Sequence, residues 1–119
     1  MIIKDFSFET HDGKTIDMEL FLNIASIKNI EKELKQINPK LNFYNAIPLI
    51  QQGEATVAII YICSCLHKPN NFRCVDSEFF DKNNINYLDY ANDLIIALIE
   101  CLQQDTKATK ENQNNNVGK

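Results

Sequence analysis

The sequence has few of the residues that build phosphate-binding loops and nucleic-acid surfaces. Its 119 residues include three glycines, which leaves little material for a glycine-rich loop that cradles a phosphate. Only one arginine is present, Arg73, and the formal net charge is -4. Proteins that hold nucleic acid by neutralising phosphates need clustered lysine and arginine. The composition therefore argues against a nucleic-acid partner.

Long hydrophobic runs are absent as well. No apolar segment reaches the length of about 20 residues that a membrane-spanning helix needs. Met1 leads within a few positions into charged residues and not into the apolar core of a signal peptide. We therefore expect no membrane partner and a cytoplasmic location.

Four cysteines are present without a secretory signal, so we expect reduced thiols that act as small apolar groups. A zinc site is the alternative, because Cys63 and His67 are four residues apart on a predicted helix and Cys74 follows after a loop. Cys65 points to a different helical face, so a fourth ligand must come from Cys101 or is missing altogether. Structural zinc sites normally use short Cys-x-x-Cys knuckles. We therefore predict no metal ion and no other cofactor.

The length and composition are those of one ordinary globular domain. A chain of this length buries about two-thirds of its unfolded surface. Apolar residues at 45% and charged residues at 24% lie in the usual globular range. We expect a single globular domain over residues 1–104, with a hairpin at 4–20 and helices at 23–104. The polar segment 105–119 has almost nothing to bury and is predicted to be disordered.

Residues 6–20, FSFETHDGKTIDMEL, alternate apolar and polar side chains on both sides of His-Asp-Gly, which predicts a β-hairpin. A two-residue loop would place Phe8 opposite Asp17, and neither face of the hairpin would be apolar. A loop of three residues, His-Asp-Gly, instead pairs Phe8 with Ile16. Gly13 then takes the last loop position, which needs a positive φ. Because an isolated hairpin is only marginally stable, its apolar face must pack on the helices that follow.

The first predicted helix begins after Asn23, a favourable N-cap, and ends at Asn38-Pro39. Isoleucine and leucine recur three or four positions apart along it, which is typical of one buried stripe. The stripe consists of Ile24, Ile27, Ile30, Leu34 and Ile37. A second helical region begins near Asn45, tolerates Pro48 in its first turn, and is interrupted at residues 52–54.

From Ala55 to Leu66 nearly every residue is apolar or small. The β-branched content could suggest a strand, but the length and the polar His67-Lys68-Pro69 ending favour a central helix buried on most sides. Burying one isoleucine or leucine side chain contributes about 1.5–3 kcal/mol, so this segment is expected to contribute most to stability.

Two more helices are predicted after the loop that follows. Asp76 or Ser77 caps a short helix, and a last helix starts near Asn86. Its apolar stripe consists of Tyr87, Ala91, Leu94, Ile95, Leu98 and Leu102. The predicted fold class is therefore α+β, mainly α, with an N-terminal β-hairpin packed on a small bundle of about four to five helices.

No arrangement typical of a catalytic centre is recognisable. His11 falls in a turn and His67 at the end of a helix, with no serine or cysteine nucleophile on a recognisable elbow. Asp76, Glu78 and Asp81 could form an acidic cluster, but acids are favoured in a first helical turn for local reasons. We predict no catalytic residues and a protein that is not an enzyme.

Aromatic residues gather in the loop and short helix between residues 72 and 90. They are Phe72, Phe79, Phe80, Tyr87 and Tyr90. Rings in such a set more often belong to the core and its rim than to a ligand-binding box. If some of them are exposed, they form a partner-binding patch, so these five are the candidate partner-binding residues.

The features that carry a family resemblance follow one another in this order: a hairpin with a Gly13-Lys14 turn, a charged helix containing IEKEL at 30–34, a Gly53-Glu54 break, the apolar helix ATVAIIYICSCLH, an acid-led short helix from Asp76 to Phe80, an apolar last helix and a polar tail. This layout, over about residues 6–104, resembles the tail assembly chaperones of long-tailed phages and prophages of low-GC Gram-positive bacteria. Pro48, the cysteine-rich helix and the long loop 68–75 depart from the family layout.

The resemblance implies a non-enzymatic role in virion assembly. Such chaperones bind the tape measure protein, keep it soluble, and help tail tube subunits polymerise around it. The implied partners are thus the tape measure protein and the tail tube protein, in the cytoplasm of the host cell. An acidic domain with apolar grooves for amphipathic helices would meet this requirement. The alternative is a small phage or bacterial regulatory or adaptor protein that binds one folded partner through residues 72–90.

Overall fold

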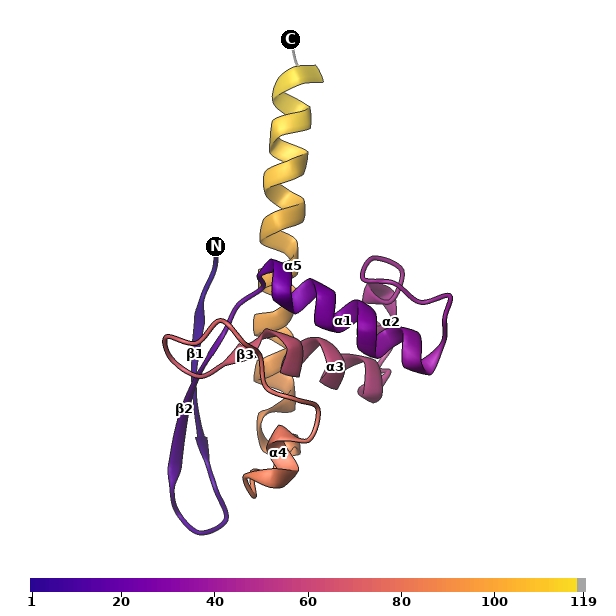
Figure 1. Cartoon of the computed structure of the whole chain (residues 1–119). Helices are drawn as coiled ribbons and strands as arrows, with labels where there is room; N and C mark the ends of the chain where they lie inside the picture. Colours follow the sequence, from indigo (N-terminus) through magenta and orange to yellow (C-terminus); the bar gives the residue numbers. More distant parts are fainter. Residues whose placement is uncertain (118–119) are drawn as a thin grey trace.

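The computed structural model describes the backbone of residues 1–117 and the side chains of residues 1–103. In chain order, its elements are β1 (Lys4–Glu9), β2 (Thr15–Leu20), α1 (Ile24–Ile37), α2 (Ile47–Gln51), α3 (Ala55–Cys65), β3 (Leu66–His67), α4 (Phe79–Lys82) and α5 (Tyr87–Val117). Figure 1 shows the β1–β2 hairpin on one side of α5 and helices α1, α2 and α3 on the other. The predicted fold class, α+β and mainly α, is confirmed.

The hairpin has the register that the alternation of apolar residues predicts. Phe8 lies opposite Ile16, and Glu9 lies opposite Thr15 at the end of the ladder. Thr10 closes the three-residue loop, because its N–H donates to the carbonyl oxygen of Lys14 at 2.8 Å. Gly13 has φ 83°, as the predicted loop requires. Phe8 is buried against the helical part of the molecule, so the predicted packing of the apolar face is also confirmed.

A third strand, β3, follows α3 directly, and the sequence analysis missed it. It pairs antiparallel with the end of β2, which places β2 in the middle of a three-stranded sheet. Val75 adds to this region, since its N–H donates to the carbonyl oxygen of Leu66 at 3.0 Å. His67 is therefore a fully buried strand residue, and its predicted position at the polar end of a helix is wrong. Pairing with β2 draws the chain out of the helix after Cys65.

Helix α1 begins and ends where its caps predict. The side-chain oxygen of Asn23 accepts a hydrogen bond from the N–H of Ser26 at 2.7 Å, and the hydroxyl oxygen of Ser26 accepts one from the N–H of Asn23 at 3.3 Å. This reciprocal pair is a capping box, which satisfies donors that a helix leaves open at its start. The helix ends at Ile37 because Asn38, which precedes a proline, has extended backbone angles.

The buried stripe of α1 is shorter than its sequence pattern indicates. Ile30 and Leu34 are fully buried, but the side chain of Ile24 is 72% exposed and that of Ile37 is 52% exposed. The prediction of a buried stripe is therefore wrong at both ends of the helix. α1 has 14 residues and packs on α3, which has 11, so the two ends of α1 extend past the helix that covers its middle.

Helix α3 is the central helix, as predicted. Helices α1, α2 and α5 all pack against it. Its buried residues are Val57, Ala58, Ile60, Tyr61, Ile62, Cys63, Ser64 and Cys65. Its buried polar groups have partners: the Tyr61 hydroxyl donates to the carbonyl oxygen of Phe43, and the Ser64 hydroxyl accepts from Asn29 Nδ2 at 2.9 Å. The segment is therefore buried without leaving these groups unsatisfied.

The remaining helices follow their local signals. Pro48 lies in the first turn of α2, and Gly53, with φ 88°, separates α2 from α3. The side chain of Asp76 accepts from the N–H of Glu78 just before α4, close to the predicted cap. α5 buries Leu94 and Leu98 and runs to Val117, through most of the segment 105–119. The side chains of that segment lie outside the described residues, so its predicted disorder stays a prediction.

Candidate protein-binding surface

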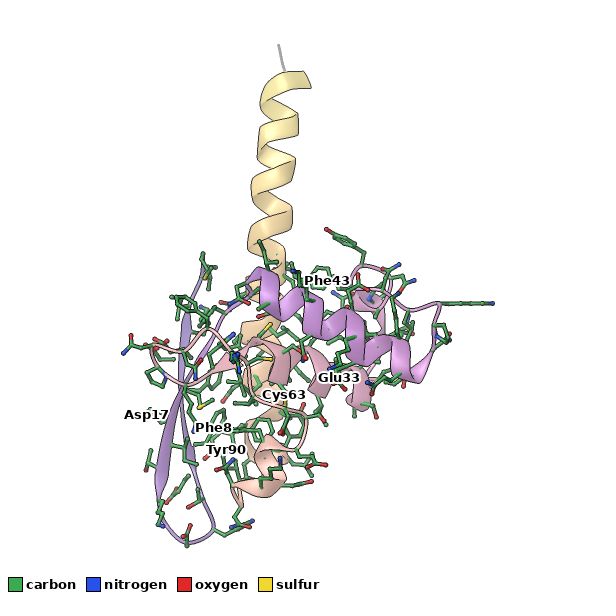
Figure 2. All side chains as sticks on the ribbon, viewed as in Figure 1. Phe8, Asp17, Glu33, Phe43, Cys63 and Tyr90 are labelled. Carbon is green, nitrogen blue, oxygen red and sulfur yellow. The ribbon has the colours of Figure 1, made fainter. Side chains whose placement is uncertain are left out.

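Four of the five candidate partner-binding aromatics turn toward the core. Phe79, Phe80 and Tyr90 surround the ring of Phe8, with ring centroids 6.2, 5.4 and 4.9 Å from it. Figure 2 shows Phe8 and Tyr90 side by side. Tyr87 packs on Phe80 at 5.1 Å. The side chains of Phe79 and Phe80 are only 5% and 4% exposed, so these two rings do not contribute to an exposed patch. They join the hairpin to α4 and α5 instead.

Tyr90 has a structural partner for its polar atom as well. Its hydroxyl oxygen accepts a hydrogen bond from the backbone N–H of Glu9 at 2.8 Å. Glu9 ends the first strand, at the outer edge of the sheet. Tyr90 therefore pairs a backbone donor at that edge, which explains its position without a binding partner.

Phe72 is the exception within the candidate set, because its ring is 80% exposed. The loop that carries it is held against the start of α1, since Asn23 Nδ2 donates to the carbonyl oxygen of Phe72 at 3.4 Å. The residue that caps α1 thus also positions this loop. Of the five candidates, Phe72 remains available for contact with a partner.

An apolar hollow lies at the same end of α1. It has a volume of about 520 Å³ and is lined by Met1, Leu22, Asn23, Ile24, Ala25 and Ile27. Met1 is 82% exposed, and Ile24 directly follows the N-cap on the outward side of the helix. We call the apolar lining of this hollow together with Phe72 the α1 surface; its members are Met1, Leu22, Ile24, Ala25, Ile27 and Phe72. Exposed apolar side chains that gather in one place are typical of interaction sites.

Exposed apolar residues elsewhere are more isolated. Tyr44 precedes α2, and Leu88 and Ile96 lie on α5 at positions eight residues apart. A hollow of about 390 Å³ between α1 and α3 is lined by Ile37, Ile59 and Ile60 as well as by polar residues, and a smaller one of about 110 Å³ lies between α2 and α5. Single exposed apolar side chains are normal on protein surfaces. The hollow of the α1 surface is lined by two strongly exposed apolar side chains, those of Met1 and Ile24, which makes it the strongest candidate in the part of the chain whose side chains are described.

Cationic residues accompany the α1 surface. Lys28 lies one helical turn after Ile24 on the same face, and Lys32 lies one turn further. Arg73 directly follows Phe72, and Lys68 lies in the same loop. All four are exposed, and among the described side chains none of them takes part in an ion pair. The candidate surface therefore combines apolar side chains with unpaired positive charge.

The acidic residues before and in α4 form no comparable site. Lys82 Nζ lies 2.9 Å from Asp76 Oδ2 and 3.6 Å from Glu78 Oε2. The hydrogen bond from Lys82, together with that from the N–H of Glu78, lowers the pKa of Asp76. These side chains are exposed and paired with one another, which agrees with a solvated cluster.

Three of the four thiols, those of Cys63, Cys65 and Cys101, are buried in the core. Burial raises the pKa of Cys63 to about 12 and raises the pKa of Cys65 as well. Cys63 and His67 do not share a helical face, because His67 belongs to β3. Cys74 lies opposite His67 across an isolated bridge. No group of three or more metal-binding side chains occurs within the described residues.

His67 occupies an apolar site. Its ring stacks on Phe21 with centroids 3.9 Å apart, and its Nδ1 lies 2.8 Å from the carbonyl oxygen of Cys65. A carbonyl can only accept, so Nδ1 carries the proton when the ring is neutral. Nε2 is buried and has no partner among the described atoms. Burial lowers the pKa of this ring, which favours the neutral form.

Comparison with protein-family models, with curated proteins and with solved structures finds no match for this chain. Within the described residues, no helix is both long enough and apolar enough to span a membrane. Function is therefore inferred from the α1 surface.

The central residue of the α1 surface, Ile24, was missed as a surface residue because its spacing fits the buried stripe. Its position immediately after the N-cap, before the helix reaches α3, is the signal that could have identified it.

Proposed function

We propose that this protein is a non-enzymatic chaperone that binds an amphipathic helical segment of another protein. The single observation that carries the proposal is the α1 surface, where an apolar hollow of about 520 Å³ adjoins exposed apolar side chains at the end of a well-packed helix. A helix of a partner buries its apolar stripe in such a groove, while the rest of the domain keeps its own core.

Within this class, the layout of hairpin, charged helix and apolar central helix favours a phage tail assembly chaperone. Its client would be the tape measure protein, whose long helical chain needs its apolar stripes covered before assembly, and tail tube subunits would join later. This work would take place in the cytoplasm of the host cell. The acidic net charge of -4 supports the role, because it limits association between copies of the chaperone.

The state of the ionisable groups supports a role without chemistry. The thiols of Cys63 and Cys65 stay protonated near neutral pH, since burial raises their pKa values far above that range. His67 is a fully buried residue of β3, with the ring of Phe21 stacked on its own ring. Groups in these positions cannot reach a substrate. The α1 surface, by contrast, is exposed and can contact a protein partner.

Co-expression with a helical fragment of a tape measure protein tests the proposal. The fragment is expected to move from the insoluble to the soluble fraction and to elute together with the chaperone in size-exclusion chromatography. The tail tube protein and an unrelated coiled-coil fragment are expressed in parallel as a second partner and a control. A tape measure fragment that stays insoluble, or that is soluble but elutes separately from the chaperone, would contradict the proposal and favour an adaptor for a folded protein.

A further inference from the structure

We infer that the α1 surface is the docking site, and that its occupant is an amphipathic helix with acidic residues beside its apolar stripe. The inference rests on the proposed function, since it names where the client docks and which chemistry the client carries. Nothing in the layout of the chain predicts it. This end of the molecule combines exposed apolar side chains, an anchored loop and unpaired positive charge among the described residues.

The apolar part of the site is preformed. The capping box between Asn23 and Ser26 fixes the first turn of α1, and the hydrogen bond from Asn23 to the carbonyl of Phe72 fixes the neighbouring loop. Ile27 packs partly against the core, so the floor of the hollow belongs to the folded domain. A partner therefore has little ordering to do on this side, which favours binding.

Methionine adds adaptability to this site. Met1 lines the hollow and is 82% exposed, so its unbranched side chain can adjust to different apolar partners. Leu22 and Ile24 are branched apolar side chains that line the hollow beside it. A flexible side chain beside fixed walls suits a client that offers several similar apolar stripes along one long helix.

The charge of the site selects the kind of helix that fits. The chain as a whole is acidic, yet Lys28, Lys32 and Arg73 accompany the α1 surface without ion-pair partners among the described residues. By contrast, Lys4 and Lys82 each pair with a nearby carboxylate. Carboxylates on a docked helix would supply the missing partners, and complementary charge also fixes the register of binding.

The same charge argues against a second copy of this chain as the occupant. A two-fold dimer places the same patch of both subunits face to face. The positive charges of Lys28, Lys32 and Arg73 would then face the same set of positive charges on the other subunit, and like charges brought together at an interface oppose binding. A partner with acidic flanks meets the surface without this repulsion.

Fluorescence anisotropy with two designed peptides tests the inference. Both peptides are helices of about 20 residues with leucines at heptad spacing; one carries glutamate beside the leucine stripe and the other carries lysine. We expect the glutamate peptide to bind the full chain at least about tenfold more tightly than the lysine peptide. The difference is expected to shrink in about 0.3 M NaCl, because the charges are exposed. Equal affinity for the two peptides would overturn the charge part of the inference.

Matched variants locate the site. Ile24→Asn is compared with Leu88→Asn, because the two side chains are 72% and 79% exposed and both lie on helices. We expect Ile24→Asn to weaken glutamate-peptide binding at least about tenfold and Leu88→Asn to change it less than about twofold. Lys28→Glu is compared in the same way with Lys40→Glu, which makes the same charge change on an exposed residue outside the surface. Melting temperatures of all four variants verify that they fold.

The outcomes separate the docking site from the proposed function. If a tape measure fragment binds the wild-type chain and Ile24→Asn equally well, the function stands and the docking site is overturned. If neither the fragment nor the glutamate peptide binds the wild-type chain, the proposed function fails. Analytical ultracentrifugation adds one more result: a wild-type dimer that Ile24→Asn dissociates would assign the surface to self-association and overturn the acidic partner.

Discussion

At the residue scale, His67 is the one described residue that has a buried side-chain nitrogen, Nε2, without a hydrogen-bond partner. Its ring is enclosed, with Phe21 on one face and the carbonyl oxygen of Cys65 at Nδ1. Protonation would add a donor at Nε2, where the described residues provide no acceptor. Glu19, which lies opposite His67 in the sheet, favours the charged ring, but the cost of burying that charge is larger and keeps the histidine neutral.

The pH dependence of stability should therefore include a contribution from His67. Burial lowers its pKa from the ordinary value of 6.5 in the folded state. The unfolded chain therefore binds the proton more readily than the folded one. The contribution of the neutral ring to the free energy of unfolding is fully present above pH 6.5 and is lost progressively as the pH falls below that value. Between about pH 7 and pH 5, the free energy of unfolding of wild type should fall more steeply than that of His67→Asn.

His11 provides the matched control for this measurement, because it is exposed in the hairpin loop. His11→Asn should keep the steep wild-type pH profile, measured by urea denaturation at each pH. Parallel profiles for wild type and His67→Asn would show that the ring does not contribute.

The cysteines make a second prediction at this scale. Cys74 is partly exposed, while Cys63 and Cys65 are buried in the core with raised pKa values. Only the thiolate is nucleophilic, so iodoacetamide near pH 8 should modify Cys74 first and leave these two core thiols intact until the protein unfolds. Peptide mass spectrometry at increasing urea concentration measures the order. Early modification of Cys63 would mean that the helix opens locally.

At the element scale, Gly13 fixes the loop that sets the register of the hairpin. Its φ of 83° lies in the left-handed region, and a Cβ added there would meet no atom within 4 Å. Gly13→Ala should therefore be destabilising through the backbone alone, by about 1–2 kcal/mol in urea denaturation. Gly13→Asn should lose less, because asparagine tolerates this region better. Equal losses for both variants would point to a cause other than the backbone angle.

Helix α4 holds the hairpin through its two phenylalanines. Phe79 and Phe80 belong to the candidate partner-binding set, but both rings pack on Phe8. Phe79→Leu and Phe80→Leu should each lower the free energy of unfolding by about 1–3 kcal/mol. Phe72→Leu, the exposed control, should change it by less than about 0.5 kcal/mol. A binding defect in Phe80→Leu with unchanged stability would restore the original hypothesis for that residue.

The comparison of these elements explains which parts of the fold the sequence could predict. The register of the hairpin was predictable, because a shift of one residue exchanges its apolar and polar faces. Core positions for most rings of the 72–90 set were favoured by the sequence, but which rings these are was not predictable, since the burial of Phe79 and Phe80 depends on Phe8, which is distant in the sequence. Strand β3 has two residues, too few for any periodicity. The exposure of Ile24 depends on where α3 ends, and a helical period carries no such information.

At the scale of the whole molecule, the hairpin and the helices share one hydrophobic core. They are joined by the pairing of β3 with β2, by the rings around Phe8, and by the ion pair between Lys4 and Glu100 at 2.5 Å. Helix α3 lies at the centre of these contacts, with α1, α2 and α5 packed on it. Opening α3 would expose most of the core, so it should open only when the whole domain unfolds.

Hydrogen exchange measures this arrangement directly. The amides of residues 58–65 in α3 should exchange most slowly, with an opening free energy equal to that of global unfolding in urea. The loop 68–73 and the hairpin turn 11–14 should exchange much faster, because these residues are exposed and the hydrogen bonds that their amides donate lie outside the strand ladders. Binding of the glutamate peptide should add protection at 22–28 and 71–73 without changing α3, since the α1 surface lies outside the core. Peptide-induced protection confined to α5 instead would mean that clients dock on the face of Leu88 and Ile96.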